Sequence, residues 1–320
     1  MRIVVFGGSG FVGSHVADAL SDAGHRVVIF DRRVSPYLRP DQEMVVGDIL
    51  DAEGVRQAVS GCQVAYHFAG LADIGEALER PLDTVRLNIL GTVTVLEAAR
   101  RADVGRFVFA STVYVYSRAG GFYRTSKQAC ESYIEEYHRQ HGLDYTILRY
   151  GSLYGRRADS KNSVHNFLYR AFKERKVSYY GSGEEIREYI HVQDAARCSV
   201  DILAEDYRNQ HVILTGHHPM KVSELMTMIQ EIVGSDVEIE YQHRMSSDHA
   251  HYRITPYSFQ PKLGRKLVRP YYLDMGQGLL DCLEGIYNEE MYAGEAGRDG
   301  GNGRRSPAAR PLRAAGVKTG

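Results

Sequence analysis

The sequence carries almost no net charge and contains no long hydrophobic run. Its 39 lysines and arginines nearly balance 40 aspartates and glutamates, which leaves a formal net charge of −1. No basic excess therefore points to nucleic acid as a partner. No apolar segment is long enough to cross a bilayer, and the chain enters a strand-like run at its start without the apolar core of a signal peptide. We expect a protein of the cytoplasm that binds neither membranes nor nucleic acid.

Cysteine is scarce and follows no pattern of a disulfide framework or a metal site. The four cysteines are Cys62, Cys130, Cys198 and Cys282. Because they are widely scattered, we predict reduced thiols. The paired histidines are His217 with His218 and His249 with His251. Both pairs lie in loop-like stretches without a neighbouring cysteine or carboxylate cluster, so we predict no metal site.

A glycine-rich turn near the start is the most informative stretch of the chain. Residues 1–6 read as a strand and residues 12–23 as an amphipathic helix, with spaced glycines between them. Glycine permits a tight turn, close approach of the backbone to phosphate groups and close packing of helix on strand. The N-terminus of the helix then faces the negative charge. The turn is therefore predicted to cradle the pyrophosphate of a dinucleotide, through Gly7, Gly10, Phe11, Val12 and Gly13.

The residues after the second strand-like run indicate which dinucleotide is bound. That run, 26–30, ends in Asp31, and an acidic residue about 20 residues after the turn can accept the ribose hydroxyls of the adenosine. Asp31 also repels a 2′-phosphate, which favours NAD. Arg32 and Arg33 follow directly and could pair with that phosphate, so NADP stays open as the alternative. We predict NAD, with Asp31 and Arg32 in its binding site.

The first half of the chain alternates between strand-like and helical segments. Apolar strands are expected at 1–6, 26–30, 43–46, 63–68, 106–110 and 144–149. Helical periodicity appears near 12–23, 51–59, 83–102 and 123–141. This alternation predicts an α/β fold with a Rossmann-type, doubly wound parallel sheet over residues 1–155.

Beyond residue 155 the regular alternation of strand-like and helical segments ends, which predicts a smaller C-terminal α/β lobe over 156–292. Its short strands are expected near 177–180, 211–214 and 237–241, and its helices near 163–174, 194–205, 222–233 and 275–291. Some of these segments could return to the sheet. Ligands of open α/β sheets bind at the carboxyl edge, so the substrate is expected between sheet and lobe. Residues 293–320 have almost no large apolar side chains and are predicted to be a disordered tail.

Tyr123 and Lys127 form a Tyr-x-x-x-Lys pair that predicts proton-transfer chemistry. A spacing of four places both side chains on one face of a helix. A tyrosine that acts as a base near neutral pH needs its pKa lowered by about 3 units, or roughly 4 kcal/mol, and we expect the lysine ammonium to supply that stabilisation. Ser111 and Thr112 end the strand-like run 106–110. Their hydroxyls are expected to bind the same substrate oxygen as Tyr123.

These features and further motifs occur in an order that resembles the extended short-chain dehydrogenase/reductase family. The matching stretches lie at 7–13, 31, 47–49, 67–70, 88–92, 107–112, 123–127, 148–150, 181–183 and 187–192. The chain is most similar to the branch of NAD-dependent nucleotide-sugar epimerases and dehydratases that includes the UDP-glucose 4-epimerases. The resemblance covers about residues 1–292.

The resemblance implies roles for further residues. By it, Asp48 and Ile49 flank the adenine and Tyr150 packs near the nicotinamide. The remaining cofactor residues implied are Phe68, Ala69, Gly70 and Asn88, together with Tyr123 and Lys127. Arg187 is expected to hold the sugar nucleotide's diphosphate, and Arg244 with Asp248 its nucleoside. The other implied substrate residues are Ser111, Thr112, Ser152, Ser163 and Val164.

Departures from the family pattern bear on the reaction. Dehydratases of the family carry an acidic pair directly after the hydroxyl residue, but Thr112 is followed by Val113 and Tyr114. Neither can act as a carboxylic acid, so dehydration is disfavoured and epimerisation favoured. The asparagine usual after the Leu-Arg-Tyr motif is Ser152, and a usual basic residue is Met245. The loop before Tyr123 is also much shorter than in the family, which is expected to open one wall of the substrate pocket.

The resulting hypothesis is an NAD-dependent epimerase that acts at C4 of a nucleotide-diphosphate sugar, with Thr112, Tyr123 and Lys127 as catalytic residues. A decarboxylase, dehydratase or reductase on the same fold is the first alternative, and Arg118 or Arg244 is a candidate cation for a sugar carboxylate. A cofactor-binding regulatory protein without turnover is the second. Helices 83–102 and 123–141 are expected to form a four-helix bundle in a homodimer. The apolar residues expected there are Val93, Leu96, Tyr133 and Ile134.

Overall fold

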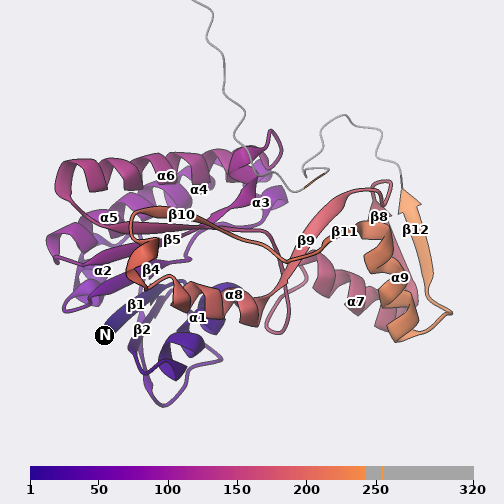
Figure 1. Ribbon diagram of the computed structural model, residues 1–320, viewed down its shortest axis with the longest axis horizontal. Helices are drawn as coiled ribbons and strands as arrows, with labels where there is room; N and C mark the ends of the chain where they lie inside the picture. The colour runs from indigo at the N-terminus through magenta and orange to yellow at the C-terminus, as the bar shows by residue number, and fades with distance from the viewer. Residues whose placement is uncertain (243–253, 255–320) are drawn as a thin grey trace, which may run out of the picture. The chain divides into compact units, whose positions relative to one another are not determined.

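A computed structural model describes residues 1–242 and residue 254 of this chain, and its centre is a seven-stranded sheet in which every neighbouring pair is parallel (Figure 1). The strands are β1 (Arg2–Phe6), β2 (Arg26–Asp31), β3 (Gln42–Val46), β4 (Val64–His67), β5 (Arg106–Thr112), β6 (Tyr145–Tyr150) and β10 (Gln210–Leu214). Their order across the sheet is β10-β6-β5-β4-β1-β2-β3. The order reverses between β1 and β4, which makes this the switch point at which such sheets bind ligands.

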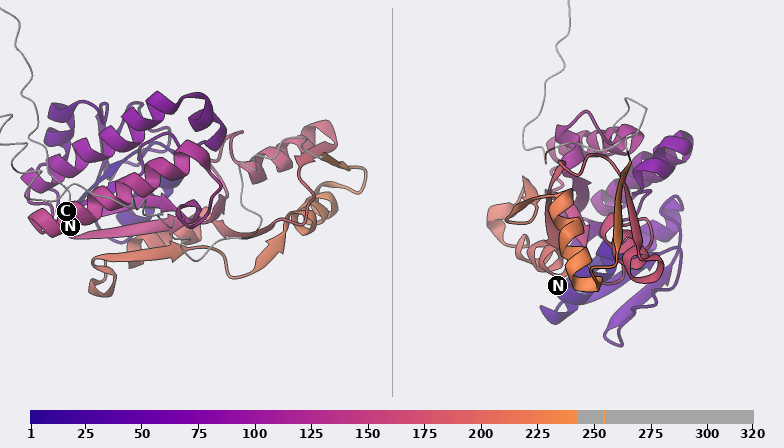
Figure 2. Two further views of the ribbon diagram at one scale, coloured as in Figure 1. Left: turned by 90° about the horizontal axis from the view of Figure 1, so that it is seen from above. Right: turned by 90° about the vertical axis from the view of Figure 1, so that its right-hand side faces the viewer.

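Helices cover both faces of the sheet because its central strands are apolar on both sides. Along β1, Val4 and Phe6 pack into one core and Ile3 and Val5 into the other. Helices α2 (Ala52–Val59), α5 (Gly91–Arg101) and α6 (Gly121–His141) cover the first face. Helices α1 (Phe11–Asp22) and α8 (Val192–Asp201) cover the second, and the views of Figure 2 show the two layers. The predicted α/β fold class with a doubly wound parallel sheet is confirmed.

The segment that leads into α5 departs from the regular helix predicted over 83–102. After α3 (Ile74–Glu79) and α4 (Pro81–Thr84), residues Val85–Leu90 form a π-helical segment, η1, before the α-helical hydrogen bonding resumes at Gly91. Such segments insert an extra residue into a helical turn and occur often at functional sites. Hydrophobic periodicity does not reveal them, because a single wide turn changes the pattern very little.

The remaining described elements form two small sheets and two helices. One sheet contains β7 (Ser152–Tyr154), β9 (Ile186–His191) and β11 (Pro219–Lys221), and the other contains β8 (Lys176–Tyr180) and β12 (Glu238–Gln242). Helices α7 (Ser163–Glu174) and α9 (Val222–Val233) pack with β8 around a separate small core. The short 3₁₀ turns η2 (Val113–Tyr116) and η3 (Glu205–Tyr207) complete the described chain.

Two segments that the sequence places in the smaller lobe, 194–205 and 211–214, lie largely with the central sheet. Strand β10 pairs with β6, from Gln210 opposite Thr146 to Leu214 opposite Tyr150. Helix α8 is held against the sheet because the Tyr66 hydroxyl donates to the Ser199 carbonyl at 2.6 Å. These placements rest on partners far away in sequence, which local periodicity cannot report. The boundary at residue 155 stays a prediction.

Several predictions lie outside the described residues: Cys282, the pair His249 with His251, helix 275–291, the tail 293–320 and Met245. No helix of the described part of the chain is long and apolar enough to span a membrane. The cytoplasmic location stays a prediction.

Candidate active site and cofactor pocket

The glycine turn between β1 and α1 lies against the loop that follows β4. Gly7 has a φ of +81°, and a Cβ atom there would lie 2.5 Å from the backbone nitrogen of Ala69. A Cβ on Gly13 would lie 2.2 Å from the carbonyl oxygen of Gly7. Any side chain at these positions would force the backbone apart. The two loops therefore form a cradle of bare backbone at the switch point of the sheet, next to the N-terminus of α1.

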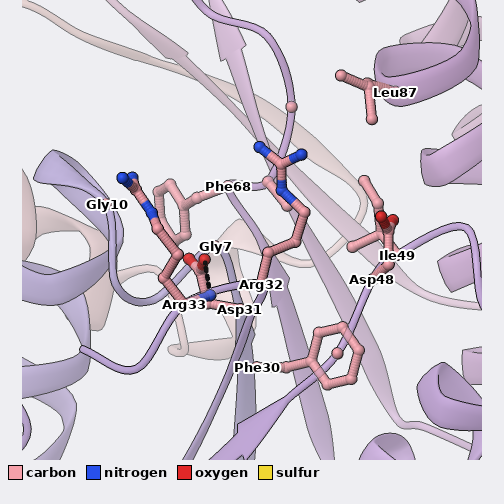
Figure 3. Close-up of a pocket in the computed structure, with 13 residues that line it drawn as sticks. Gly7, Gly10, Phe30, Asp31, Arg32, Arg33, Asp48, Ile49, Phe68 and Leu87 are labelled. Atoms are coloured by element: carbon pink, nitrogen blue, oxygen red, sulfur yellow. Dashed lines mark hydrogen bonds between the residues drawn. The ribbon is translucent and has the colours of Figure 1, made fainter.

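A cavity of about 190 Å³ opens beside this cradle, at the carboxyl ends of β1, β2 and β4 (Figure 3). Its lining contains nine residues predicted to bind the cofactor: Gly7, Gly10, Asp31, Arg32, Asp48, Ile49, Phe68, Ala69 and Gly70. Arg33, the second arginine weighed as a partner for a 2′-phosphate, lines it too. The sequence reasoning missed Phe30, Gly47 and Leu87. Phe30 and Gly47 stand directly before Asp31 and Asp48, so their positions were a signal that could have found them.

Asp31 is held at the edge of this cavity by two backbone donors. Its carboxylate accepts hydrogen bonds of 3.2 Å from the N–H groups of Ser9 and Arg33, and Figure 3 shows the carboxylate in the turn from which the two arginines extend. The side chains of Arg32 and Arg33 belong to exposed residues. A carboxylate with two donors has further lone pairs for the hydroxyls of a ligand.

Asn88, predicted to touch the cofactor, holds the loop after β4 instead of lining the cavity. Its side-chain oxygen accepts from the Leu71 N–H at 2.6 Å, and its amide group donates to the Leu71 carbonyl at 3.0 Å. The amide also donates to the Ser126 hydroxyl at 2.9 Å. A Cβ on Gly70 would lie 2.7 Å from the Asn88 oxygen. Asn88 therefore links η1, the β4 loop and α6.

Three of the predicted catalytic groups come together at the carboxyl end of β5. Tyr123, in the first turn of α6, is hydrogen-bonded to the Thr112 side chain. Lys127 lies one turn further along α6, and its ammonium donates to the Ala110 carbonyl at 2.7 Å. The ammonium nitrogen is 4.6 Å from the centre of the Phe109 ring and 5.8 Å from that of Tyr123. A hydroxyl, a phenol and an ammonium thus share one small region.

The expected lowering of the Tyr123 pKa is wrong for the protein without its cofactor. Burial raises the pKa of Tyr123 to about 12, and the hydrogen bond with Thr112 opposes this only weakly. Burial also lowers the pKa of Lys127 to about 8, although Cys130 and Glu131 act in the opposite direction. For each group, removal from water outweighs the contacts that favour its charged form, because the charge loses its hydration.

The structure does not bring Ser111 together with Thr112 and Tyr123. Successive residues of a strand point to opposite faces of the sheet, and the Ser111 hydroxyl donates to Glu131 of α6. Tyr150 is placed differently again, since its hydroxyl is 2.6 Å from the Ser199 hydroxyl and its ring is 6.3 Å from that of Phe68. Phe11, Val12 and Gly13 belong to the start of α1.

The predicted substrate residues are spread over several elements. Ser152 begins β7, while Ser163 and Val164 begin α7. Arg187 of β9 is 7% exposed, and one of its guanidinium nitrogens donates to the Ile186 carbonyl at 3.0 Å. Arg244 and Asp248 lie outside the described residues.

The connection from η2 to α6 is as short as the sequence predicts. Gly120, at a φ of +92°, precedes the first residue of α6, so the helix starts two residues before Tyr123. Among the described residues, no group of three or more His, Cys, Asp or Glu side chains could hold a metal ion.

A doubly wound parallel sheet with a glycine cradle at its switch point and an acidic residue at the end of β2 defines a dinucleotide-binding protein of the Rossmann type. The family model described as the NAD dependent epimerase/dehydratase family matches residues 3–215, and the chain belongs to this family. The resemblance drawn from the sequence is thereby confirmed, and so is NAD as the cofactor.

Individual relatives agree with this assignment. A putative UDP-glucose 4-epimerase of Methanocaldococcus jannaschii is 29% identical over 260 residues, which cover 75% of this chain and 85% of the relative. The structure of a UDP-glucose 4-epimerase of Thermotoga maritima, solved with UDP-glucose, matches with a TM-score of 0.74, 27% identity and coverage of 81% and 90% of the two chains. The structure of a UDP-glucose 4-epimerase of Thermus thermophilus in complex with NAD matches with a TM-score of 0.73 and 26% identity, and the match covers 83% of this chain and 95% of that chain.

Proposed function

We propose that this protein is an epimerase that inverts C4 of a nucleotide-diphosphate sugar. The observation that carries the proposal is the convergence of Thr112, Tyr123 and Lys127 at the end of β5. The protein's similarity to UDP-glucose 4-epimerases from several organisms supports the choice of reaction.

The residues at the switch point fit NAD. The close approach of Gly7, Gly13 and Ala69 leaves bare backbone beside the N-terminus of α1, whose first N–H groups have no partner within the helix and can face a pyrophosphate. Asp31 offers a carboxylate for the ribose. When bound, NAD would supply a reversible hydride acceptor for the sugar carbon and a positive charge that acts against the effect of burial on the Tyr123 pKa.

The chain's own residues then handle the proton. Tyr123 takes the proton of the sugar hydroxyl on its phenol oxygen and gives it back after the sugar has turned. Thr112, already hydrogen-bonded to Tyr123, orients the same sugar oxygen. Lys127, fixed by the Ala110 carbonyl, supplies the positive charge that stabilises the phenolate. Arg187 anchors the diphosphate, so the sugar ring can rotate without leaving the site.

Dehydration is less well supported than epimerisation. Val113 is fully buried and Tyr114 stands next to it, so no carboxylic acid follows Thr112 directly. A decarboxylase remains the second candidate because the family also includes such enzymes, among them a UDP-glucuronic acid decarboxylase of Arabidopsis thaliana that is 26% identical over 276 residues.

The test is incubation of the purified protein with a panel of nucleotide-diphosphate sugars, with product stereochemistry followed by NMR. The proposal predicts interconversion of two C4 epimers with no net change in NAD. Release of carbon dioxide from a hexuronate substrate would favour the decarboxylase instead. Absence of any turnover across the panel would favour a regulatory protein.

Replacing Asp31 by Ala is expected to shift the cofactor preference toward NADP by about tenfold or more. The change removes the negative charge that repels a 2′-phosphate and leaves Arg32 and Arg33 in place. Dissociation constants for NAD and NADP, measured by calorimetry on both proteins, provide the check. Asp41→Ala is the matched control, because that exposed carboxylate pairs with Arg39 outside the cavity. A wild-type preference for NADP would contradict the role given to Asp31.

We further propose a homodimer formed through the helices around α5 and α6. Two of the apolar residues predicted for this interface, Leu96 and Ile134, are buried in the core of the chain and are not accessible to a second subunit. Exposed apolar residues nevertheless remain on α6 and on the segments that lead into α5, namely Leu82 of α4, Val85 and Leu90 of η1, and Tyr133 of α6. Light scattering at micromolar concentration is expected to give twice the mass of the chain. A wild-type monomer would refute the proposal.

A further inference from the structure

A buried carboxylate lies one helical turn beyond Lys127, on the same face of α6. Glu131 is 7% exposed, and it accepts hydrogen bonds from two strands. The Ser111 hydroxyl of β5 donates to Oε1. The guanidinium of Arg149 in β6 donates to Oε1 at 3.0 Å and to Oε2 at 2.6 Å. This two-pronged contact fixes both the distance and the orientation of α6 relative to β6.

Arg149 carries the connection onward to the turn that follows Thr112. Its third nitrogen donates to the hydroxyl of Tyr116, and the guanidinium lies 4.7 Å from the centre of the Tyr116 ring. Tyr116 is the last residue of η2, which begins directly after Thr112. The segment from Thr112 to the start of α6 is thus tied to Glu131 at one end through Ser111 and near its middle through Tyr116.

We infer that Glu131 is a positioning residue for the reaction. Together with Ser111 and Arg149, it fixes the relative positions of the three catalytic side chains, Thr112, Tyr123 and Lys127. The inference rests on the proposed function, since it concerns the geometry of that site. It also gives Ser111 a role different from substrate binding, because the hydroxyl is committed to Glu131.

Stability alone does not account for this network. A buried ion pair is often no more stabilising than apolar side chains of the same volume, because both charges lose their hydration. The two-pronged ion pair also defines the orientation of α6 relative to β6, because both carboxylate oxygens are held by one guanidinium. The short connection before α6 is also tied to that helix by two hydrogen bonds, from Arg124 to the Ser117 carbonyl at 3.1 Å and from Gln128 to the Val115 carbonyl at 2.8 Å. Neither of them reaches β6, which Glu131 and Arg149 join to α6. Misplacement of a catalytic group by about 1 Å can cost about a hundredfold in rate.

The titratable and charged groups around Glu131 come from β6, β10 and α6 itself. Arg149 approaches from β6, and His211 of β10 lies 3.8 Å from Oε2. Lys127 and Glu135 lie one turn away on α6, and Nε2 of His211 is 2.9 Å from Oε1 of Glu135. The negative charge of Glu131 favours the ammonium form of Lys127, against the effect of burial that lowers the Lys127 pKa.

The first test is Glu131→Gln, which keeps the shape and removes the charge. We expect kcat per NAD-loaded site to fall by about tenfold to a hundredfold, with the KM for the nucleotide sugar within about threefold. Glu136→Gln is the matched control, because this residue lies on the same helix but pairs with Arg139 at the surface. An unchanged kcat in a folded, NAD-loaded Glu131→Gln protein would overturn the inference.

The pH profile separates positioning from a loss of folded protein. Loss of the Glu131 charge lowers the pKa of Lys127, so the ammonium is lost at a lower pH. The alkaline limb of kcat is therefore expected to move to lower pH in Glu131→Gln and to stay in place in Glu136→Gln. Partial unfolding would lower kcat by the same factor at every pH, without moving the alkaline limb to lower pH.

A double-mutant cycle decides how Ser111 acts. If its hydroxyl works through Glu131, Ser111→Ala lowers kcat in the wild-type background and has little further effect in Glu131→Gln. Additive losses would mean that Ser111 contacts the substrate directly, which overturns the inference. If Glu131→Gln does not fold, Ser111→Ala alone tests the inference. A wild-type kcat in Ser111→Ala would then refute the positioning role of the Glu131 network. Loss of activity in Tyr123→Phe alongside a normal Glu131→Gln would refute this inference but leave the proposed function intact.

Discussion

Tyr123→Phe is expected to lower kcat by at least about a hundredfold while the fold and the bound NAD are kept, the size typical of a lost general base. The variant removes one oxygen from a half-buried ring, and that oxygen is the partner of Thr112. The ring itself still fills its place beside Lys127. Binding of the sugar nucleotide should change little, because the diphosphate is proposed to be held by Arg187 and not by Tyr123.

The measurement is steady-state kinetics normalised to NAD content, with unfolding temperature as a check on the fold. Tyr137→Phe is the matched control, since it removes a hydroxyl from the same helix that is hydrogen-bonded to Glu97 at 3.3 Å, away from the site. Turnover of Tyr123→Phe at the wild-type rate would exclude the assigned mechanism, whatever the substrate proves to be.

Gly7→Ala is expected to abolish stoichiometric NAD binding and to destabilise the protein by more than about 3 kcal/mol. Two costs combine at this position. An alanine at a φ of +81° is strained, and its Cβ would lie 2.5 Å from the Ala69 nitrogen. Relief of that contact pushes apart the two loops that form the cradle, so the bare backbone and the N-terminus of α1 no longer form one surface for a phosphate group.

Gly24→Ala is the control that separates the two costs. Gly24 has nearly the same φ, +80°, but a Cβ there would meet no atom within 4 Å. It should show the conformational cost alone, about 1–2 kcal/mol, with NAD binding unchanged. Urea unfolding and calorimetric NAD titration of both variants provide the comparison. Equal destabilisation of the two proteins would show that the close approach at Gly7 carries no energetic weight.

The local elements and most of the residues that line the cavity were predictable because their signals lie in short stretches of sequence. The run of buried apolar residues from Ile3 to Phe6 follows from the requirements of a central strand. The spaced glycines follow from those of the turn, and Asp31 from those of a ribose. The spacing of Tyr123 and Lys127 likewise places both on one face of α6, whatever lies elsewhere in the fold.

What could not be predicted depends on partners far apart in sequence or on competing energies. The position of β10 is set by β6, about sixty residues earlier along the chain. The Tyr123 pKa is set by the balance of burial against charge, and that balance requires coordinates. The orientation of Ser111 is different, because the alternation of side chains along β5 could have separated it from Thr112 without a structure.

The return of β10 to the edge of the sheet has a consequence for how the chain folds. Residues 151–209 are an excursion between two strands that are hydrogen-bonded neighbours, β6 and β10. During synthesis β6 emerges well before β10, so its outer edge stays unpaired until β10 has been made. The Tyr66 hydroxyl likewise lacks its acceptor, the Ser199 carbonyl, until α8 has been made. Contacts of such long sequence separation slow folding. A fragment that stops at residue 155 would keep the glycine cradle and the Tyr123 helix, yet it would leave this flank of the sheet uncovered and prone to pair with other chains.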